Sequence, residues 1–370
     1  MNDNPTATPT PVELGFSMPA EFAPHDACWM LWPQRPDNWR YGAKPAQAAF
    51  VAVAKAIAES ETVFVGVNDD QYENARHQLP AQIRVVELSS NDAWMRDVGP
   101  TFLTHPDGRL AMVDWEFNAW GGLNGGLYFP WDKDRRIRLK IAEMLGVERF
   151  FTPLVLEGGA IHVDGEGTLI TTEECLLNPN RNPNLSKPDL ERLLGNYLGV
   201  SKVIWLSRGC YQDETDGHVD NLCCFVAPGE VALTWTNDKD DPQYAISCEA
   251  LTILESASDA KGRPFKVHKL PQPGPLTIAD SEASGVDRLS SSRPRQPGDR
   301  MAGSYVNFYI GNSVVVMPRL DPQRDDEARE IIEGLFPGRQ VIAIDAREIL
   351  LGGGNIHCIT QQQPRCTLAA

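Results

Sequence analysis

The chain has 370 residues, of which 42% are hydrophobic, 8% aromatic and 23% charged, and this ordinary globular composition excludes a disordered chain, a fibre and a coiled coil. A formal net charge of −16 would repel phosphate backbones and attract small cations, so nucleic acid is not an expected partner. No apolar run approaches the roughly 20 residues that a bilayer span needs, so a membrane is not an expected partner either.

Residues 1–14 lack the basic and apolar regions of a signal peptide. We expect them to form a short flexible tail, followed by a single domain over residues 15–370. The eight cysteines are sparse and form no CxxC motif, whereas disulfide scaffolds are short and rich in cysteine. Together these features predict a reduced, cytoplasmic protein.

Five segments show the apolar period of a helix, and each is followed by a run typical of a β-strand. The predicted helices cover residues 46–60, 135–146, 187–199, 243–258 and 325–338, and the predicted strands cover 62–67, 149–156, 202–207, 265–270 and 340–345. Helix end signals support this pattern. Pro188 lies in the first turn of one predicted helix, and Gly146 and Gly199 come directly after two helical runs.

A short polar or glycine-rich segment, here called a polar junction, follows each of these strands and leads into another β-rich stretch. The five polar junctions begin at Asp97, Glu157, His218, Ser304 and Gly354, at steps of 60, 61, 86 and 50 residues. A repeat of this size predicts a closed, pseudo-symmetric array of α/β units rather than two unrelated domains.

A doubly wound parallel sheet is the alternative fold, because it also alternates helix and strand. Two features of the sequence count against it. No GxGxxG motif follows the first strand, and hairpin-type turns follow the polar junctions where a parallel sheet would need crossovers. Residues 281–299 are polar and rich in turn formers, and they predict a long surface loop that is a candidate lid.

Equivalent positions of a pseudo-symmetric ring converge on its axis. We therefore expect the polar junctions to bring together Asp97, Glu157, His218, Asp220 and Cys358. Residues two apart on a strand face the same side, which applies to His218 and Asp220. Each of the five alone is weak evidence, since a surface ion pair at Asp97 or a turn acid at Glu157 would be common.

Cys358 follows three consecutive glycines, residues 352–354. A buried, inert cysteine is the commonest outcome for such a residue. The glycines favour a functional site instead, because they let another group approach the backbone closely. A phosphate loop is excluded by the missing Lys and Ser/Thr. Metal is not expected, because His162 and His357 are not part of a motif with metal-ligand spacing.

Three carboxylates around one thiol and one imidazole would repel an anionic substrate and suit a guanidinium, whose N–H groups pair with carboxylates in bidentate fashion. A Cys-His-Asp protease would instead need donors directed at an oxyanion. Trp94 is a candidate for an apolar wall along the substrate. The acidic run Asp213, Glu214 and Asp216 is either a solvated loop or an anchor for a cationic tail.

Long motifs in the polar junctions resemble the agmatine deiminases of the guanidino-group-modifying, or pentein, superfamily. The segments are MRDVGP, EGGAIHVDGEG, EECLLNPNRNP, DGHVDN, SYVNFYI and GGGNIHCITQQQP, and the resemblance extends from about Gly15 to Pro364. It implies a five-bladed pseudo-symmetric α/β propeller with one catalytic domain over residues 15–370. It also implies hydrolysis of agmatine to N-carbamoylputrescine and ammonia without a cofactor, and a homodimer as the candidate assembly.

The resemblance also implies a role for each candidate residue. Cys358 would be the nucleophile, and His218 would act as general acid and base. Glu157 would orient His218 and contact the guanidinium, while Asp97 and Asp220 would hold the guanidinium nitrogens.

The remaining substrate contacts depend on residues outside this set. Trp94 would contact the substrate stem, and Glu214 would bind the distal amine, with Asp213 and Asp216 as alternatives to Glu214. An acidic residue here would favour an amine tail and repel the α-carboxylate of arginine.

Three enzymatic alternatives remain open from the sequence: a peptidyl-arginine deiminase, a free-arginine deiminase and an amidinotransferase. A propeller that only binds a partner is the fourth alternative, but it would not need these side chains at matching positions. Detecting ammonia and N-carbamoylputrescine after incubation with agmatine would separate the four.

Overall fold

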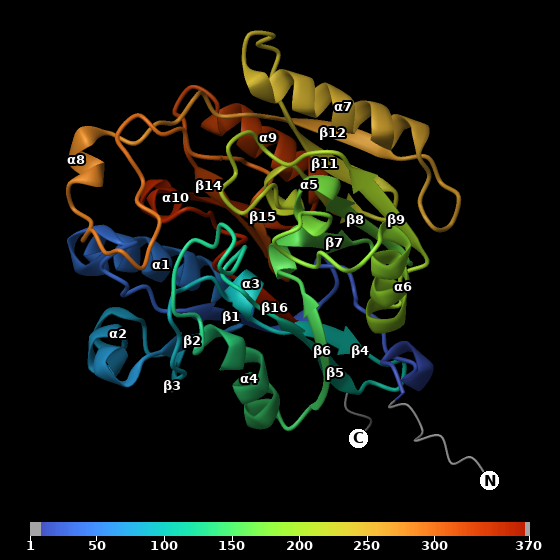
Figure 1. The fold of residues 1–370 in the computed structure, drawn as a ribbon, viewed down its shortest axis with the longest axis horizontal. Coiled ribbons are helices and arrows are strands. Elements are labelled where there is room, and N and C mark those ends of the chain that lie inside the picture. The colour runs from blue at the N-terminus through green and yellow to red at the C-terminus, as the bar shows by residue number, and fades with distance from the viewer. Residues whose placement is uncertain (1–8, 367–370) are drawn as a thin grey trace.

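The computed structural model of the protein describes residues 9–366 and forms five small mixed sheets with helices packed outside them (Figure 1). Four sheets are built from consecutive segments of the chain. Their strands are β4 (Thr101–Thr104), β5 (Leu110–Glu116) and β6 (Glu148–Val155); β7 (Ile161–Val163), β8 (Thr168–Thr172) and β9 (Lys202–Leu206); β10 (Cys223–Ala227), β11 (Glu230–Trp235) and β12 (Lys266–Pro271); and β13 (Tyr309–Ile310), β14 (Val314–Arg319) and β15 (Gln340–Asp345).

The fifth sheet joins the two ends of the described chain. Its strands, in spatial order, are β16 (Gln361–Pro364), β1 (His25–Leu31), β2 (Thr62–Val67) and β3 (Arg84–Glu87). In every sheet, the strand after the polar junction pairs antiparallel with the next strand, which pairs parallel with a third. The predicted five-bladed pseudo-symmetric α/β propeller is therefore confirmed.

One long helix connects the two parallel strands of each sheet, because a parallel pair needs a crossover. These helices are α1 (Lys44–Ile57), α4 (Ile137–Leu145), α6 (Lys187–Leu198), α7 (Pro242–Ser256) and α9 (Asp325–Leu335). They match the five predicted helices to within a few residues. Gly146 and Gly199 end α4 and α6 in the left-handed conformation, and Ser186 and Asp189 form a capping box at the start of α6.

Shorter helices lie in the segments that connect the strands. They are α2 (Tyr72–Gln78), α3 (Met95–Val98), α5 (Glu173–Leu176), α8 (Asp280–Ala283) and α10 (Arg347–Leu351). The sequence pattern misses α2 and β3, because α2 buries Ala75 alone and β3 has four residues. Of the predicted tail, residues 1–8 lie outside the described residues, and Val12–Leu14 forms a 3₁₀ turn.

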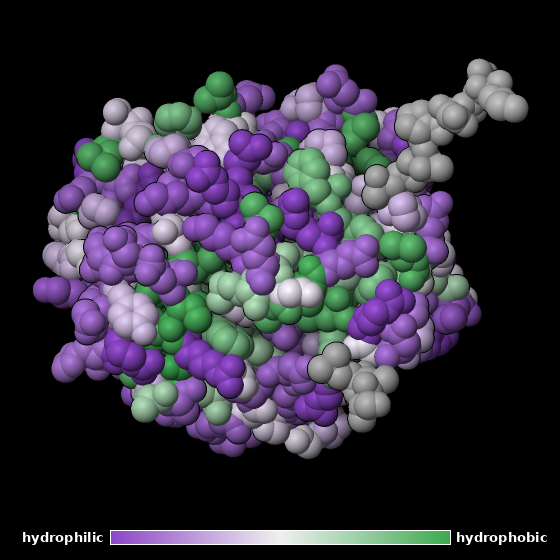
Figure 2. Space-filling view, turned by 90° about the horizontal axis from the view of Figure 1, so that it is seen from below, coloured by the Kyte–Doolittle hydropathy of each residue, from purple (hydrophilic) through white to green (hydrophobic). Residues whose placement is uncertain are grey.

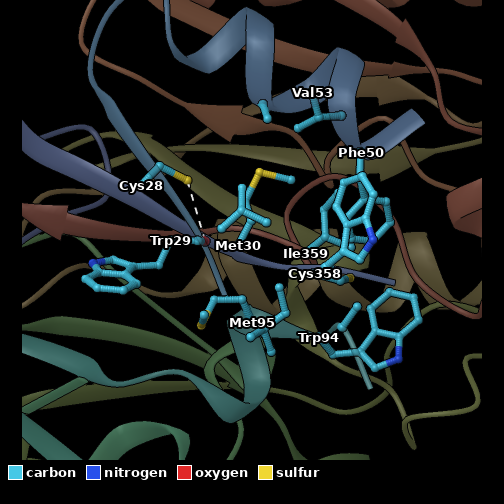
Figure 3. Close-up of a cluster of buried hydrophobic side chains, with 14 of the residues drawn as sticks. Cys28, Trp29, Met30, Phe50, Val53, Trp94, Met95, Cys358 and Ile359 are labelled. Carbon is cyan, nitrogen blue, oxygen red and sulfur yellow. Dashed lines mark hydrogen bonds between the residues drawn. The ribbon is translucent and has the colours of Figure 1, made fainter. Parts of the chain in front are cut away.

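Cys358 belongs to a large cluster of buried hydrophobic side chains, in which Figure 3 shows it with Ile359 and Trp94. Cys358 thus lies in the interior rather than on the surface. Hydrophilic residues cover most of the face in Figure 2, and apolar residues gather near its middle. No helix within residues 9–366 combines the length and apolar character needed to cross a membrane.

Candidate active site

The polar junctions bring all five predicted residues of the site into the interior. Asp97 lies on α3 before β4, and Glu157 precedes the turn that leads into β7. His218 and Asp220 lie at the turn before β10, and Cys358 lies between α10 and β16. All five side chains are buried, with Cys358 the most exposed at 8%. Four repeats therefore contribute the predicted side chains.

The Cys358 thiol lies between a carboxylate and an amide. Its Sγ atom is 3.6 Å from Oδ2 of Asp220, to which it donates, and it accepts from Nδ2 of Asn307 at 3.4 Å. Burial, followed by the negative charges of Asp220 and Asp97, raises the pKa of Cys358 well above its ordinary value. Without a bound cation the group is therefore a neutral thiol.

The His218 ring lies between two carboxylates. Nδ1 is 3.9 Å from Oδ2 of Asp97, and Nε2 is 3.8 Å from Oε2 of Glu157. Burial alone would lower the pKa of His218, but Asp97, Cys175 and Glu157 together raise it well above its ordinary value. At neutral pH the ring is therefore an imidazolium that can donate a proton.

Glu157 is held by a buried arginine that the sequence analysis gave no role. Nε of Arg181 donates to Oε1 of Glu157 at 2.7 Å, and its Nη2 donates to the carbonyl oxygen of Thr215 at 2.8 Å. Burial alone would raise the pKa of Glu157, but Arg181, followed by His218, lowers it to about 2. Glu157 thus remains ionised beside His218.

Asp97 and Asp220 differ in the acceptors they leave free. Both carboxylate oxygens of Asp97 accept, from the Gly159 backbone N–H and from Nε1 of Trp120, each at 2.9 Å. Oδ2 of Asp220 accepts from Nδ1 of His357 at 2.8 Å, whereas its Oδ1 is buried and has no hydrogen-bond partner within residues 9–366. Asp220 therefore has an acceptor available for a ligand.

A pocket with about 580 Å³ of empty space, its open mouth included, lies over Cys358 and His218. Trp94, the candidate for the stem contact, lines it and donates from Nε1 to Oδ2 of Asp92 at 3.1 Å. Trp120 forms another part of the wall. The volume suits a small molecule.

The three glycines before Cys358 are explained by what lies against them. A Cβ at Gly352 would come within 2.2 Å of the Trp39 ring, and one at Gly354 within 2.4 Å of the Trp94 ring. Gly353 has a φ of +106°, which favours glycine, and a Cβ there would collide with side-chain atoms of other residues at 2.2 Å. The expected close approach to the backbone is present at each of the three.

Glu214 lines the pocket but is already paired with an arginine of the loop over residues 281–299. Nε and Nη2 of Arg295 donate to Oε1 of Glu214 at 2.8 and 2.5 Å, and this pair lies against Gly353. The same loop is tied down beside the pocket, where the Arg293 backbone N–H donates to the Leu127 carbonyl oxygen at 2.9 Å. The loop therefore forms part of the pocket wall, and its role as a lid stays a prediction.

Asp213 and Asp216 do not line this pocket. Oδ2 of Asp216 accepts from Nη1 of Arg181 at 2.9 Å and from Nδ2 of Asn180 at 2.8 Å. Asp213 is partly buried and accepts from the backbone N–H and the hydroxyl of Thr215 and from the side-chain amide of Asn221. Asp213 therefore stabilises its own loop and Asp216 pairs with Arg181, and neither acid contributes to the wall of this pocket.

Residues 17–364 match the model of the Porphyromonas-type peptidyl-arginine deiminases. The chain belongs to this family. It is 59% identical over 363 residues to the agmatine deiminase of Pseudomonas aeruginosa (strain LESB58), with 98% of each chain covered, and 58% identical over 361 residues to that of Pseudomonas syringae pv. syringae (strain B728a), with 97% of this chain and 98% of the relative covered. A solved agmatine deiminase of Enterococcus faecalis superposes with a TM-score of 0.95 at 48% identity, over 97% of this chain and 98% of that chain. The family resemblance is thus confirmed.

Within residues 9–366, two side-chain groups carry enough ligand atoms for a metal ion. They are Glu157, Cys175 and His218, and Glu21, His162 and His357. An arginine already occupies each group, since Arg181 donates to Glu157 and Arg96 donates to Glu21. A cation would be repelled by either guanidinium, so neither group suits a metal ion well.

Two residues of the deiminase site were missed from the sequence. Asn307, in the fourth polar junction, contacts the Cys358 sulfur, and its place in the repeat was the available signal. Arg181 comes from the segment NPNRNP, which carried the family resemblance but had no assigned role. Asn307 contacts Cys358 and Arg181 contacts Glu157, and these two contacts could be identified only from the fold.

Proposed function

We propose that this chain hydrolyses agmatine to N-carbamoylputrescine and ammonia, a step from arginine towards putrescine. The observation that carries the proposal is the buried thiol of Cys358 beside the acceptors of Asp220, with an imidazolium at His218. Such a site matches a planar cation that reacts at its central carbon. The names of the relatives support the same substrate.

Agmatine binds with its guanidinium between Asp97 and Asp220, where Oδ1 of Asp220 accepts an N–H bond. The bound cation offsets the two carboxylates, so it lowers the pKa of Cys358 and the thiol releases its proton to solvent. The thiolate then attacks the central carbon. Its position beside the held guanidinium replaces a bimolecular encounter with an intramolecular step.

His218 moves protons in both halves of the reaction. It protonates one terminal nitrogen of the tetrahedral adduct, which leaves as ammonia, and a thiouronium remains on Cys358. The neutral ring then takes a proton from water, and the resulting hydroxide attacks the same carbon. Collapse expels the thiolate and, after loss of one proton, leaves the urea group of N-carbamoylputrescine.

The first experiment supplies agmatine, free arginine and an arginyl peptide separately and measures ammonia and the ureido product. Agmatine should be turned over with the highest kcat/KM. Release of an amidine to an added amine instead of water would favour an amidinotransferase. No ammonia from any guanidine would overturn the proposal.

Removing one guanidinium acceptor should strongly weaken catalysis. Asp97→Asn or Asp220→Asn keeps the size but leaves a guanidinium N–H unpaired in a desolvated site, so kcat/KM for agmatine should fall by roughly 100-fold or more, about 3 kcal/mol. Steady-state kinetics on each variant checks this. Asp114→Asn is a matched control, because its buried carboxylate pairs with Arg149 away from the pocket. A modest rise in KM alone would mean that guanidinium recognition lies elsewhere.

Glu214 is proposed to hold the distal amine, which would have to compete with Arg295 for the carboxylate. Glu214→Gln should raise KM for agmatine about 5-fold, because a partly exposed pair contributes about 0–1 kcal/mol. It should also reduce the preference of the enzyme for agmatine over arginine. The ratio of kcat/KM values for the two substrates measures it. Arg295→Met is the control that breaks the ion pair and keeps the acid. If substitutions at 213, 214 and 216 leave the ratio unchanged, another group binds the amine.

We also propose a cytoplasmic location and a homodimer. The eight thiols within residues 9–366 are all free, and those that are buried lie in clusters of hydrophobic side chains, which fits a reduced protein. Fractionation of cells that produce the protein tests the location. Light scattering on the purified protein tests the dimer.

A further inference from the structure

A buried series of charged groups lies behind Asp220 and takes no part in the steps above. Nδ1 of His357 is 2.8 Å from Oδ2 of Asp220, and Nε2 of His357 is 2.9 and 3.0 Å from the two carboxylate oxygens of Glu21. Nη1 of Arg96 donates to Oε1 of Glu21 at 3.0 Å. All four side chains are buried.

The position of the His357 ring determines its protonation state. An ionised carboxylate can only accept, so each ring nitrogen must donate, whereas a neutral imidazole has one N–H. Arg96 keeps Glu21 ionised by pairing with it directly. The count of charges balances only with His357 as an imidazolium, since two carboxylates then face one arginine and one histidine cation.

The other titratable neighbours are consistent with this state. The ring of His162 stacks on that of His357 at 6.1 Å, and its Nδ1 accepts from the Phe225 backbone N–H, so its Nε2 is the nitrogen that faces Glu21, at 3.4 Å. His162 therefore approaches Glu21 through Nε2 only. On the other side, Asp220 also faces the Cys358 thiol, which donates to it.

We propose that His357, held by Glu21, is a positioning residue that keeps Asp220 ionised and fixes its orientation. The inference rests on the proposed function of Asp220 in binding the guanidinium. His357 holds Oδ2 of Asp220, which leaves Oδ1 as the acceptor for the substrate. Without the imidazolium of His357, Asp220 would lose the cation that is hydrogen-bonded to it and keep only the through-space attraction of His218 and Arg96, so burial would favour its protonated form more strongly.

The test compares variants that keep or remove the donor to Asp220. His357→Leu removes both N–H groups, whereas the amide nitrogen of His357→Asn can occupy the position of Nδ1 and still donate. We expect His357→Leu to raise KM for agmatine at least 30-fold and to move the acid limb of the pH profile of kcat/KM upward by at least one pH unit. In His357→Asn, KM for agmatine should be at least tenfold lower than in His357→Leu.

His162→Gln is the matched control, because it changes a buried histidine beside Glu21 that does not touch Asp220. Its KM should stay within 3-fold of the wild-type value. The acid limb of its pH profile should stay within 0.3 pH unit of that of the wild type. An equal loss of kcat/KM at every pH in His357→Leu, with the acid limb unmoved, would mean a merely structural role and would overturn the inference.

A second measurement is independent of turnover and of the stability of any variant. Nitrogen NMR of the substrate-free wild-type protein reports whether each histidine ring carries one or two N–H groups. His357 should carry two at pH 7.5, and a neutral ring there would overturn the inference. Wild-type protein with a doubly protonated His357 but no activity on agmatine would instead contradict the proposed function alone.

Discussion

Replacing Cys358 with serine is expected to lower agmatine turnover by at least about 10⁴-fold while agmatine still binds, because an unactivated hydroxyl is a far weaker nucleophile than a thiolate. The carboxylates that hold the guanidinium are unchanged in this variant. Ammonia release measures turnover, and calorimetry measures binding. Calorimetry at two buffer ionisation enthalpies should also detect a proton released on binding to the wild type and none in the variant.

The covalent intermediate gives the same prediction a direct readout. Mass spectrometry of acid-quenched wild-type enzyme should find the amidine adduct on the peptide that contains Cys358. Cys223→Ser and Cys224→Ser are the matched controls, since both thiols are buried and neither lines the pocket. An adduct on Cys223, Cys224 or Cys366 would contradict the assignment.

The second large effect is expected at His218. His218→Ala should abolish both ammonia release and hydrolysis of the intermediate, since the ring supplies the proton for one and removes it for the other. The pKa of His218 is raised, so the imidazolium persists at neutral pH and is lost only as the pH rises through that raised value. In the wild type, activity should therefore fall on the alkaline side as the general acid is lost.

Steady-state assays between pH 6 and pH 10 on the wild type and on His218→Ala check this prediction. Any residual activity of the alanine variant should lack the alkaline limb, because the titrating acid has been removed. Activity within tenfold of the wild type would mean that another group, such as His162 or His357, is the acid and base.

The repeat and its helices were predictable because each follows from a local pattern. The apolar period marks α6, and Ser186 and Gly199 mark its ends. The strand pairing of the fifth sheet was not predictable in this way, because β1 and β16 lie at opposite ends of the described chain. Periodicity identifies strands but does not identify distant partners.

The same distinction between local patterns and distant contacts applies to the candidate site. Asp97, Glu157, His218 and Cys358 could be inferred from matching repeat positions, because the ring axis brings such positions together. The pairing of Glu214 with Arg295 could not, since it joins two loops whose paths no local pattern determines. The charged state of His357 likewise depends on two partners far from it in the chain.

The antiparallel pairing of β1 with β16 has a consequence for how the protein is made. His25 lies opposite Pro364, so the repeat that carries Cys358 is completed by strands from opposite ends of the described chain. During translation, the four sheets built from consecutive segments can form before this one, and a nascent chain that has not yet emerged past β16 lacks both its closing strand and its nucleophile. A circular permutant with the termini joined and a new opening at the exposed turn between β4 and β5, at Pro106 and Asp107, should therefore place the complete repeat on one stretch of chain and still form the ring.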